Sequence, residues 1–306
     1  MRVPIDFPLA ARYLFKAMKP AIPRSVAARL DYLLKFLHYR RHIRVVTRSQ
    51  RGAGSRLMIA IVHLNAPDFL LLSLHAARAL HRDAAIVVID NGSTPRVLDH
   101  VKRLCQRYEC TVLHNESTYR DHVLAIQLAI ELANALNKDY LAILDNDTVL
   151  KSSLYTVVDA MNRCGAVLAG PHDVMPYSRG YLRYAPLAVH ASLMILRPRE
   201  VMEAGGRFCS FNYVIDRFSQ TPEPYHSLAY ACLGRVLYLK PRVIENLFPL
   251  TVYTLNDHVI GYHAWYSSRI RLSALRDVDR LQVDYILEQH RKIKRFLVSE
   301  VSYLSP

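Results

Sequence analysis

Several features that mark common protein classes are missing from the sequence. It has only five cysteines, an odd number, and no Cys-x-x-Cys pair, so neither a disulfide framework nor a zinc ribbon is indicated. No Gly-x-Gly-x-x-Gly follows a strand-like run, which argues against a dinucleotide-dependent dehydrogenase. No stretch reaches the roughly 18 uninterrupted apolar residues of a membrane-spanning helix, and the first residues lack the apolar region of a signal peptide. We therefore expect a cytoplasmic protein that does not cross a membrane.

Apolar side chains and positive charge are abundant instead. Apolar residues occupy 51% of the 306 positions, which is enough for the core of one large domain or two small ones. The net charge is +14, and residues 1–50 contain 11 lysines or arginines against two aspartates, a local excess of +9. Most of the positive charge therefore belongs to the N-terminal part of the chain.

Residues 1–55 are predicted to form a basic, amphipathic helical extension, and residues 266–306 a basic helical tail. In the extension, leucines recur at the spacing of one helix face, at Leu30, Leu33, Leu34 and Leu37. Basic residues flank them: Arg29, Lys35, Arg40 and Arg41. Such a helix can bind an anionic membrane surface at the cytosolic face, or pack on the main domain or on a second copy in an oligomer. We expect no nucleic acid partner, because the basic residues are not interleaved with stacking aromatics.

From residue 56 onward, strand-like and helix-like patterns alternate. Apolar runs predict strands at 57–62, 85–89, 111–113 and 140–144, and helical spacing predicts helices at 68–80, 97–104 and 121–136. This alternation favours right-handed β-α-β units. It predicts an α/β fold with a mostly parallel sheet and helices on both faces.

The pattern becomes less regular after residue 151. Helices are predicted at 153–161, 198–203 and 224–233, and strands at 166–169, 191–196 and 235–239. We therefore expect a main domain at 56–265 with two halves, 56–150 and 151–265.

Two polar segments directly follow predicted strands, at Asp90–Thr94 and Asp145–Thr148. Ligands of such sheets bind at the carboxyl ends of the strands. In an extended segment, Asp145 and Asp147 leave the chain on the same side and can share one hard divalent cation, although an acidic turn that caps the next helix is the alternative. A second Asp-x-Asp, Asp277-Val278-Asp279, follows no strand and is interpreted as a solvated helix face.

Three segments together resemble glycosyltransferase family 2, whose members have the GT-A fold and use nucleotide sugars. Ala60-Ile-Val-His-Leu-Asn65 resembles the opening strand and turn, Val88-Ile-Asp-Asn-Gly-Ser-Thr94 is similar to the family's Val-Val-Asp-Asn-Gly-Ser-Thr, and Leu144-Asp-Asn-Asp-Thr148 resembles its Asp-x-Asp segment. The resemblance covers about residues 56–265, and implies a nucleotide-binding half at 56–150 and an acceptor half at 151–265.

The resemblance also implies roles for single residues. Asp90 would accept a hydrogen bond from the nucleobase, and the turn at Asn65 would border the nucleoside. Asp145 and Asp147 would hold Mn²⁺ or Mg²⁺, with a late histidine, His263 rather than His258, as third ligand. The remaining expected donor-site residues are Asn91, Asn146 and His122, the last at a helix N-terminus that favours anions.

An inverting transfer, which the family implies, needs a carboxylate that takes the proton of the attacking hydroxyl. Asp216 is the predicted catalytic base, with Asp173 and Glu223 as alternatives. The leading prediction is an inverting, metal-dependent hexosyltransferase acting on a glycan or lipid-linked acceptor. A catalytically inactive scaffold that binds nucleotide sugar or glycan is the alternative. A nucleotidyltransferase is disfavoured, because His63-Leu-Asn-Ala-Pro67 contains no Gly, Lys or Arg to cradle a triphosphate.

Overall fold

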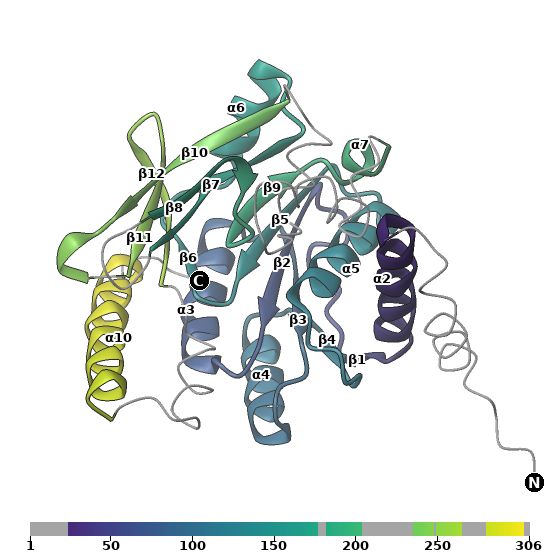
Figure 1. Cartoon of the computed structure of the whole chain (residues 1–306), viewed down its shortest axis with the longest axis horizontal. Helices are drawn as coiled ribbons and strands as arrows, with labels where there is room; N and C mark the ends of the chain where they lie inside the picture. Colours follow the sequence, from purple (N-terminus) through teal and green to yellow (C-terminus); the bar gives the residue numbers. More distant parts are fainter. Residues whose placement is uncertain (1–23, 177–181, 204–234, 248, 265–279, 303–306) are drawn as a thin grey trace, which may run out of the picture.

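The computed structural model describes residues 24–176, 182–203, 235–247, 249–264 and 280–302 (Figure 1). Four parallel strands form the first half of its sheet: β2 (Leu57–His63), β3 (Ala85–Asp90), β4 (Thr111–Asn115) and β5 (Tyr140–Asp145). Their spatial order is β4-β3-β2-β5. The predicted α/β architecture with a mostly parallel central sheet is confirmed.

Helices α3 (Pro67–Leu80), α4 (Pro95–Arg107) and α5 (His122–Ala135) connect these strands. Proline occupies the first turn of α3 and of α4, where its missing N–H costs nothing. The side chain of Asp121 caps α5 by accepting a hydrogen bond from the Val123 N–H at 2.9 Å.

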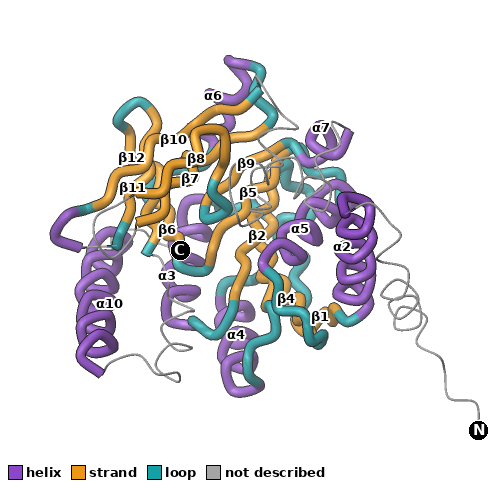
Figure 2. Tube along the Cα trace, viewed as in Figure 1, coloured by secondary structure: helices purple, strands orange, loops and turns teal. Residues whose placement is uncertain are grey.

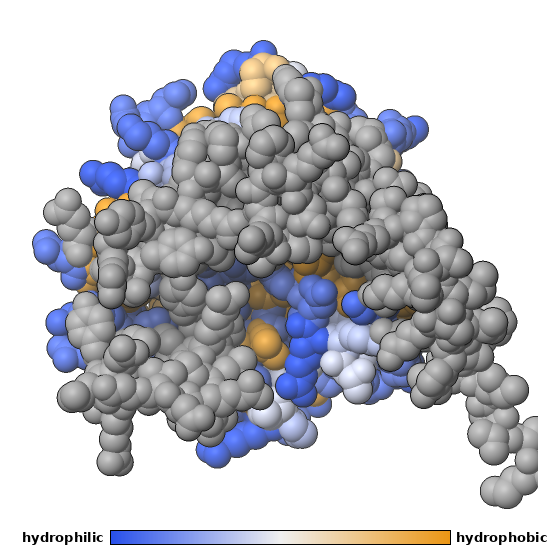
Figure 3. All heavy atoms as spheres, in the orientation of Figure 1, coloured by the Kyte–Doolittle hydropathy of each residue, from blue (hydrophilic) through white to orange (hydrophobic). Residues whose placement is uncertain are grey.

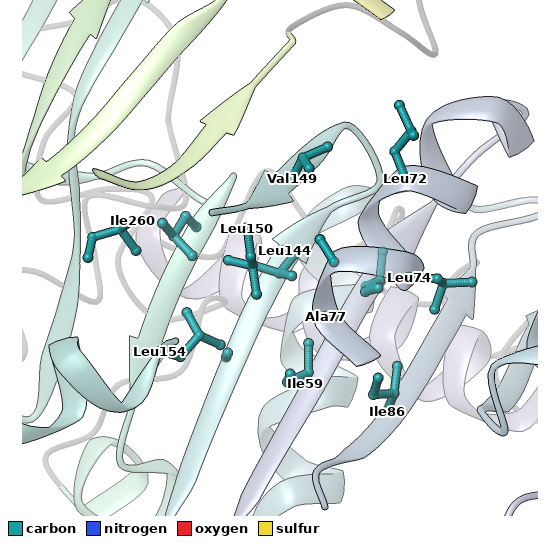
Figure 4. Close-up of a cluster of buried hydrophobic side chains, with 14 of the residues drawn as sticks. Ile59, Leu72, Leu74, Ala77, Ile86, Leu144, Val149, Leu150, Leu154 and Ile260 are labelled. Atoms are coloured by element: carbon teal, nitrogen blue, oxygen red, sulfur yellow. The ribbon is translucent and has the colours of Figure 1, made fainter. Parts of the chain in front are cut away.

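Every residue of β2 is buried, because both faces of the sheet are covered. Leu57, Ile59 and Ile61 face the cluster formed with α3 and α4, together with α6 (Tyr155–Cys164). Figure 4 shows part of this cluster around Ile59, with side chains of α3 on one side. The alternate residues of β2 face a second cluster, formed with α5. Burial of this apolar run on both faces fixes the place of β2 in the middle of the sheet.

The strands of the second half of the sheet, drawn in orange in the upper left part of Figure 2, pair largely antiparallel. Its strands are β6 (Thr148–Leu150), β7 (Leu168–Pro176), β8 (Leu182–Val189), β9 (Leu193–Leu196), β10 (Val236–Val243), β11 (Thr251–Leu255) and β12 (His258–His263). The order continues from β5 as β9-β7-β10-β11-β12-β6, with β8 paired to β7. Helix α7 (Pro198–Glu203) follows β9, and a 3₁₀ turn (Glu245–Leu247) follows β10.

The β11–β12 hairpin returns the chain to the Asp145-Asn146-Asp147 segment. Asn256 and Asp257 form its two-residue turn with φ of 49° and 63°, the left-handed conformation of a type I′ turn. Strand β12 then pairs antiparallel with β6, and His263 lies opposite Thr148. This pairing places His263 beside Asp147, although more than 100 positions separate them in the sequence.

The predicted N-terminal extension contains a helix and an unanticipated strand. Helix α2 (Arg24–Arg41) packs on the sheet through Phe36 and Tyr39, which are buried in the cluster with α5. Strand β1 (Ile43–Thr47) pairs antiparallel with β4 and forms an edge of the sheet. Of the predicted leucine stripe, Leu33 and Leu37 are exposed at 45% and 43%. The aromatic residues, and not these two leucines, therefore attach the helix.

Helix α10 (Arg280–Val301) lies on the opposite side of the view from α2 (Figure 1). It packs beside α3 and buries Ile293, Leu297 and Val301 in the first cluster. Among the described residues, no helix has both the length and the apolar character needed to cross a bilayer.

Some predictions lie outside the described residues: the catalytic base Asp216, its alternative Glu223, and the helix at 224–233. The other alternative base, Asp173, belongs to β7.

Candidate active site at the carboxyl edge of the sheet

Two carboxylates and an imidazole converge where β5, β6 and β12 meet. Asp145 ends β5, Asp147 precedes β6, and His263 ends β12. The Nε2 atom of His263 lies 3.2 Å from a carboxylate oxygen of Asp147 and 3.6 Å from one of Asp145. One donor atom from each residue lies within 4.8 Å of the other two, a spacing that could hold one metal ion. His258, the alternative to His263, is exposed at the other end of β12.

A chain of hydrogen bonds orients His263, which is only 3% exposed. Its Nδ1 lies 3.1 Å from the hydroxyl of Tyr253, and that hydroxyl lies 2.7 Å from Oγ of Ser192. With Nδ1 engaged, Nε2 faces the two carboxylates. Partners of this kind fix the orientation of metal-ligating histidines.

His122 reaches the same site from the first turn of α5. Its Nε2 lies 2.8 Å from a carboxylate oxygen of Asp145. Burial lowers the pKa of His122, but the charge of Asp145 and its hydrogen bond outweigh burial and raise that pKa. Burial in turn raises the pKa of Asp145, and the charge of His122 outweighs it and holds this pKa well below its usual range. The pair therefore favours an ionised Asp145.

His190 also belongs to this site, although the sequence analysis did not identify it. Its ring centroid lies 5.6 Å from that of His263, and the residue is 8% exposed. The backbone N–H of Ser192 donates to its Nδ1 at 3.1 Å. The signal in the sequence was a polar residue directly before the strand predicted at 191–196, and this signal is weak among 14 histidines.

A second polar group surrounds Asp90, at the end of β3. One carboxylate oxygen accepts from Nδ1 of His63 at 2.8 Å, and the other accepts from Nδ1 of His114 at 2.7 Å and from the Ser93 N–H at 3.2 Å. Burial raises the pKa of Asp90, but the hydrogen bonds from His114 and His63 outweigh burial and hold the pKa well below its usual range. Asp90 is therefore an ionised carboxylate inside the protein.

Asparagines tie the neighbouring turns together. Asn65, with a φ of 52°, accepts a hydrogen bond from the Thr94 N–H at 3.1 Å, and its own N–H donates to Ser93 Oγ at 2.9 Å. Asn91 is buried, and its side-chain oxygen accepts from Asn115 at 3.3 Å. These bonds join the turns that follow β2, β3 and β4 into one rigid edge.

The predicted site residues thus fall into two groups. Asp145, Asp147, His263 and His122 lie together, while Asp90, Asn91 and Asn65 form the second group. Asn146, which stands between Asp145 and Asp147 in the sequence, is buried, and its N–H donates to the carbonyl oxygen of Val62 in β2 at 3.1 Å. Because β2 lies between β3 and β5, the two groups are about two strand spacings apart, roughly 10 Å.

Solved structures that are similar to this chain include a mannosyltransferase and TarS. The mannosyltransferase PcManGT from Pyrobaculum calidifontis, in complex with GDP-Man and Mn2+, is 14% identical with a TM-score of 0.46, over 95% of this chain and 84% of that one. TarS 1-349 from S. aureus, in complex with UDP, is 13% identical with a TM-score of 0.47, over 76% and 69% of the chains. No curated protein matches the sequence.

The family assignment comes from the sequence itself. The family model described as Glycosyl transferase family 2 matches residues 58–217, which is more than half of the 306 residues. The predicted family and its GT-A fold are thereby confirmed. The chain therefore belongs to glycosyltransferase family 2 and has the fold of a nucleotide-sugar glycosyltransferase.

Proposed function

We propose that this protein is an inverting, metal-dependent hexosyltransferase that moves a sugar from a nucleotide sugar to a glycan or lipid-linked acceptor. The observation that carries this proposal is the convergence of Asp145, Asp147 and His263 at the carboxyl edge of the sheet. Asp145, Asp147 and the polar group around Asp90 lie in the region that the family model covers, residues 58–217, and His263 lies beyond it.

The donor atoms suit a divalent cation such as Mn²⁺ or Mg²⁺. Two carboxylates and one imidazole with its second nitrogen engaged form a ligand set of this kind. When bound, the metal would neutralise negative charge on the departing nucleoside diphosphate. His122 lies at the N-terminus of α5 and contacts Asp145. A helix N-terminus favours anions, so the diphosphate of the donor is proposed to lie there.

The nucleoside part of the donor is proposed to lie over the turns at Asn65, Asp90 and Asn91. The hydrogen bonds between these turns preorganise that surface, since no rearrangement of their backbone is required. Asn146, with its buried backbone bond to β2, connects this surface to the metal ligands.

The acceptor hydroxyl needs a base as its oxygen attacks the anomeric carbon. Asp216 is the proposed base, with Asp173 and Glu223 as the alternatives that the sequence offers. The acceptor oxygen forms its bond to the anomeric carbon, the bond to the diphosphate breaks on the opposite face, and the hydroxyl proton passes to the carboxylate. This sequence of events inverts the configuration of the sugar.

Calorimetric binding of UDP and GDP, each with and without Mn²⁺, tests the donor site. We expect one nucleotide to bind in a metal-dependent manner to the wild type, and this binding to disappear in Asp147→Asn. Asp257→Asn is the matched control, because Asp257 is exposed in the β11–β12 turn, where asparagine adopts the same left-handed backbone. Binding of neither nucleotide to folded wild type would contradict the proposal, and binding without sugar transfer would favour the inactive scaffold.

Contact with an anionic membrane surface is proposed for the exposed face of α2. Leu33 and Leu37 lie one turn apart with about 45% of each exposed, and Arg40 and Arg41 are exposed at the end of the same helix. Figure 3 shows hydrophilic side chains along the upper and left edges of the visible face, and does not show the surface of α2.

Point variants test this contact better than a deletion, because removal of α2 would also remove Phe36 from the core. We expect Leu33→Glu/Leu37→Glu to sediment less with phosphatidylserine vesicles than the wild type does. Leu136→Glu is the control, since Leu136 is equally exposed beyond the end of α5. Equal sedimentation of all three proteins would refute the contact.

A further inference from the structure

We propose that His114, and not Asp90, contacts the nucleobase of the donor, and that it accepts a hydrogen bond from the imide N–H of uracil or thymine. Asp90 then acts as a positioning residue that orients the ring of His114. This inference rests on the proposed use of a nucleotide sugar and assigns the class of base at that site.

The first observation is that Asp90 is fully enclosed. Its side chain is 0% exposed, and both of its oxygens already accept hydrogen bonds from within the protein. His63, which binds one of these oxygens, is also 0% exposed, and its other nitrogen accepts the Ala66 N–H at 3.2 Å. A base that approached Asp90 directly would have to displace these partners.

His114 is the member of this group that reaches the surface. It lies opposite Asp90 in the β3–β4 register, and its side chain is 15% exposed. Its Nδ1 is bound to Asp90, while no described residue forms a hydrogen bond with its Nε2. Because Asp90 only accepts, Nδ1 carries the proton of this hydrogen bond, and Nε2 is the nitrogen left to present a lone pair to a ligand.

The position of His114 suits the base end of a nucleotide. It stands on β4, three strands from β5 and its metal-site carboxylates, which corresponds to about 14 Å at the usual strand spacing. An extended nucleoside diphosphate has a comparable length. The turn at Gly92 lies between His114 and the carboxylates that end β5. The side chain of Arg120 lies against this turn, within 3.5 Å of the position that a Cβ on Gly92 would occupy.

One lone pair at Nε2 discriminates between bases by their hydrogen-bonding edges. Uracil and thymine present one ring N–H between two carbonyl groups, which a single acceptor satisfies. Guanine presents two adjacent donors, a ring N–H and an amino group, which a carboxylate binds better than an imidazole does. Cytosine and adenine present a ring nitrogen with a lone pair, which Nε2 would repel. The geometry therefore favours uracil or thymine.

Competition between UDP, dTDP, GDP, CDP, ADP and N3-methyl-UDP, measured by calorimetry with Mn²⁺, tests this assignment. We expect UDP or dTDP to bind best to the wild type, and N3-methylation of UDP to weaken binding about tenfold or more, since one hydrogen bond is lost. In His114→Phe, which keeps a ring but lacks the nitrogen, UDP and N3-methyl-UDP should bind equally. His114→Gln, which restores an acceptor, should recover part of the difference.

The ¹⁵N shifts of the His114 ring test the role of Asp90 separately. We expect Nε2 to be unprotonated in the free wild type and to shift on addition of UDP, and Asp90→Asn to give a mixture of tautomers. His258→Phe is the control for the histidine variants, since His258 is exposed at the β11–β12 turn.

The outcomes separate the two proposals. Preferred binding of GDP, or an equal effect of N3-methylation in wild type and His114→Phe, would overturn the role of His114 and leave the donor site intact. Absence of binding of every nucleotide to folded wild type would overturn both.

Discussion

Acid should destabilise this protein through one buried histidine, His81, which follows α3. The residue is 1% exposed, its Nε2 accepts the Leu154 N–H at 3.0 Å, and its Nδ1 is buried without a hydrogen-bond partner among the described residues. Burial lowers the pKa of His81 from 6.5 to about 4; nearby Asp83 opposes this shift and Arg78 adds to it. The folded protein therefore keeps the ring neutral.

The sign and size of the effect follow from linkage. Between pH 6.5 and pH 4 the unfolded chain binds a proton that the folded protein does not, so the stability present above pH 6.5 is lost as the pH falls. For a pKa of about 4, the loss between about pH 7.5 and pH 4.5 is roughly 2.5 kcal/mol in the free energy of unfolding. This is a large part of the 5–15 kcal/mol of a typical protein.

Urea denaturation of the wild type and of His81→Gln at several pH values measures this contribution. Glutamine can still accept a hydrogen bond from the Leu154 N–H, so we expect His81→Gln to lower the free energy of unfolding by about 1 kcal/mol at neutral pH. From there to pH 4.5, the free energy of unfolding of the variant should fall by about 2.5 kcal/mol less than that of the wild type. His258→Gln is the control, because His258 is exposed and should retain the slope of the wild type. Parallel pH profiles of wild type and His81→Gln would refute the reasoning.

Two further predictions concern the support of His263. A Cβ on Gly261 would lie 2.9 Å from the carbonyl oxygen of Val149, so Gly261→Ala should displace β12 from β6 and lower the free energy of unfolding by about 1–3 kcal/mol. The same variant should weaken Mn²⁺ binding, measured by electron paramagnetic resonance, and an unaltered Mn²⁺ affinity would contradict the prediction. Gly54→Ala is the control and should change neither stability nor Mn²⁺ affinity, because a Cβ at that position meets nothing within 4 Å. Tyr253→Phe removes the hydroxyl beside Nδ1 of His263, and should weaken Mn²⁺ binding about 10–100-fold with little change in secondary structure. If Tyr253→Phe bound Mn²⁺ as tightly as the wild type does, the hydroxyl would not orient His263.

The regular half of the fold was predictable from the sequence because its signals are local. The run at residues 57–62 is apolar at consecutive positions, as a strand covered on both faces requires, and the alternation with helices implied a parallel sheet. The Asp145-Asn146-Asp147 segment could be placed at a strand end for the same reason.

The second half was less predictable, because its strands are held by pairings between distant segments. Strand β1 contains Arg44 and the exposed Val45, and only its pairing with β4 makes it a strand. The hairpin at Asn256 and Asp257 carries turn residues that typify a type I′ loop, a signal that the sequence analysis did not use.

By itself, the sequence determined the family and the parallel core of the sheet. It also showed that Asp90, Asp145 and Asp147 follow strands, because an apolar run and the polar residues that end it are neighbours in the sequence. Only the tertiary structure decided which side chains meet. Pairing of β12 with β6 placed His263 rather than His258 beside Asp145 and Asp147, and pairing of β3 with β4 placed His114 beside the enclosed Asp90. Hydrogen bonds between strands depend on register across long stretches of chain, and no local pattern encodes which partner a strand will find.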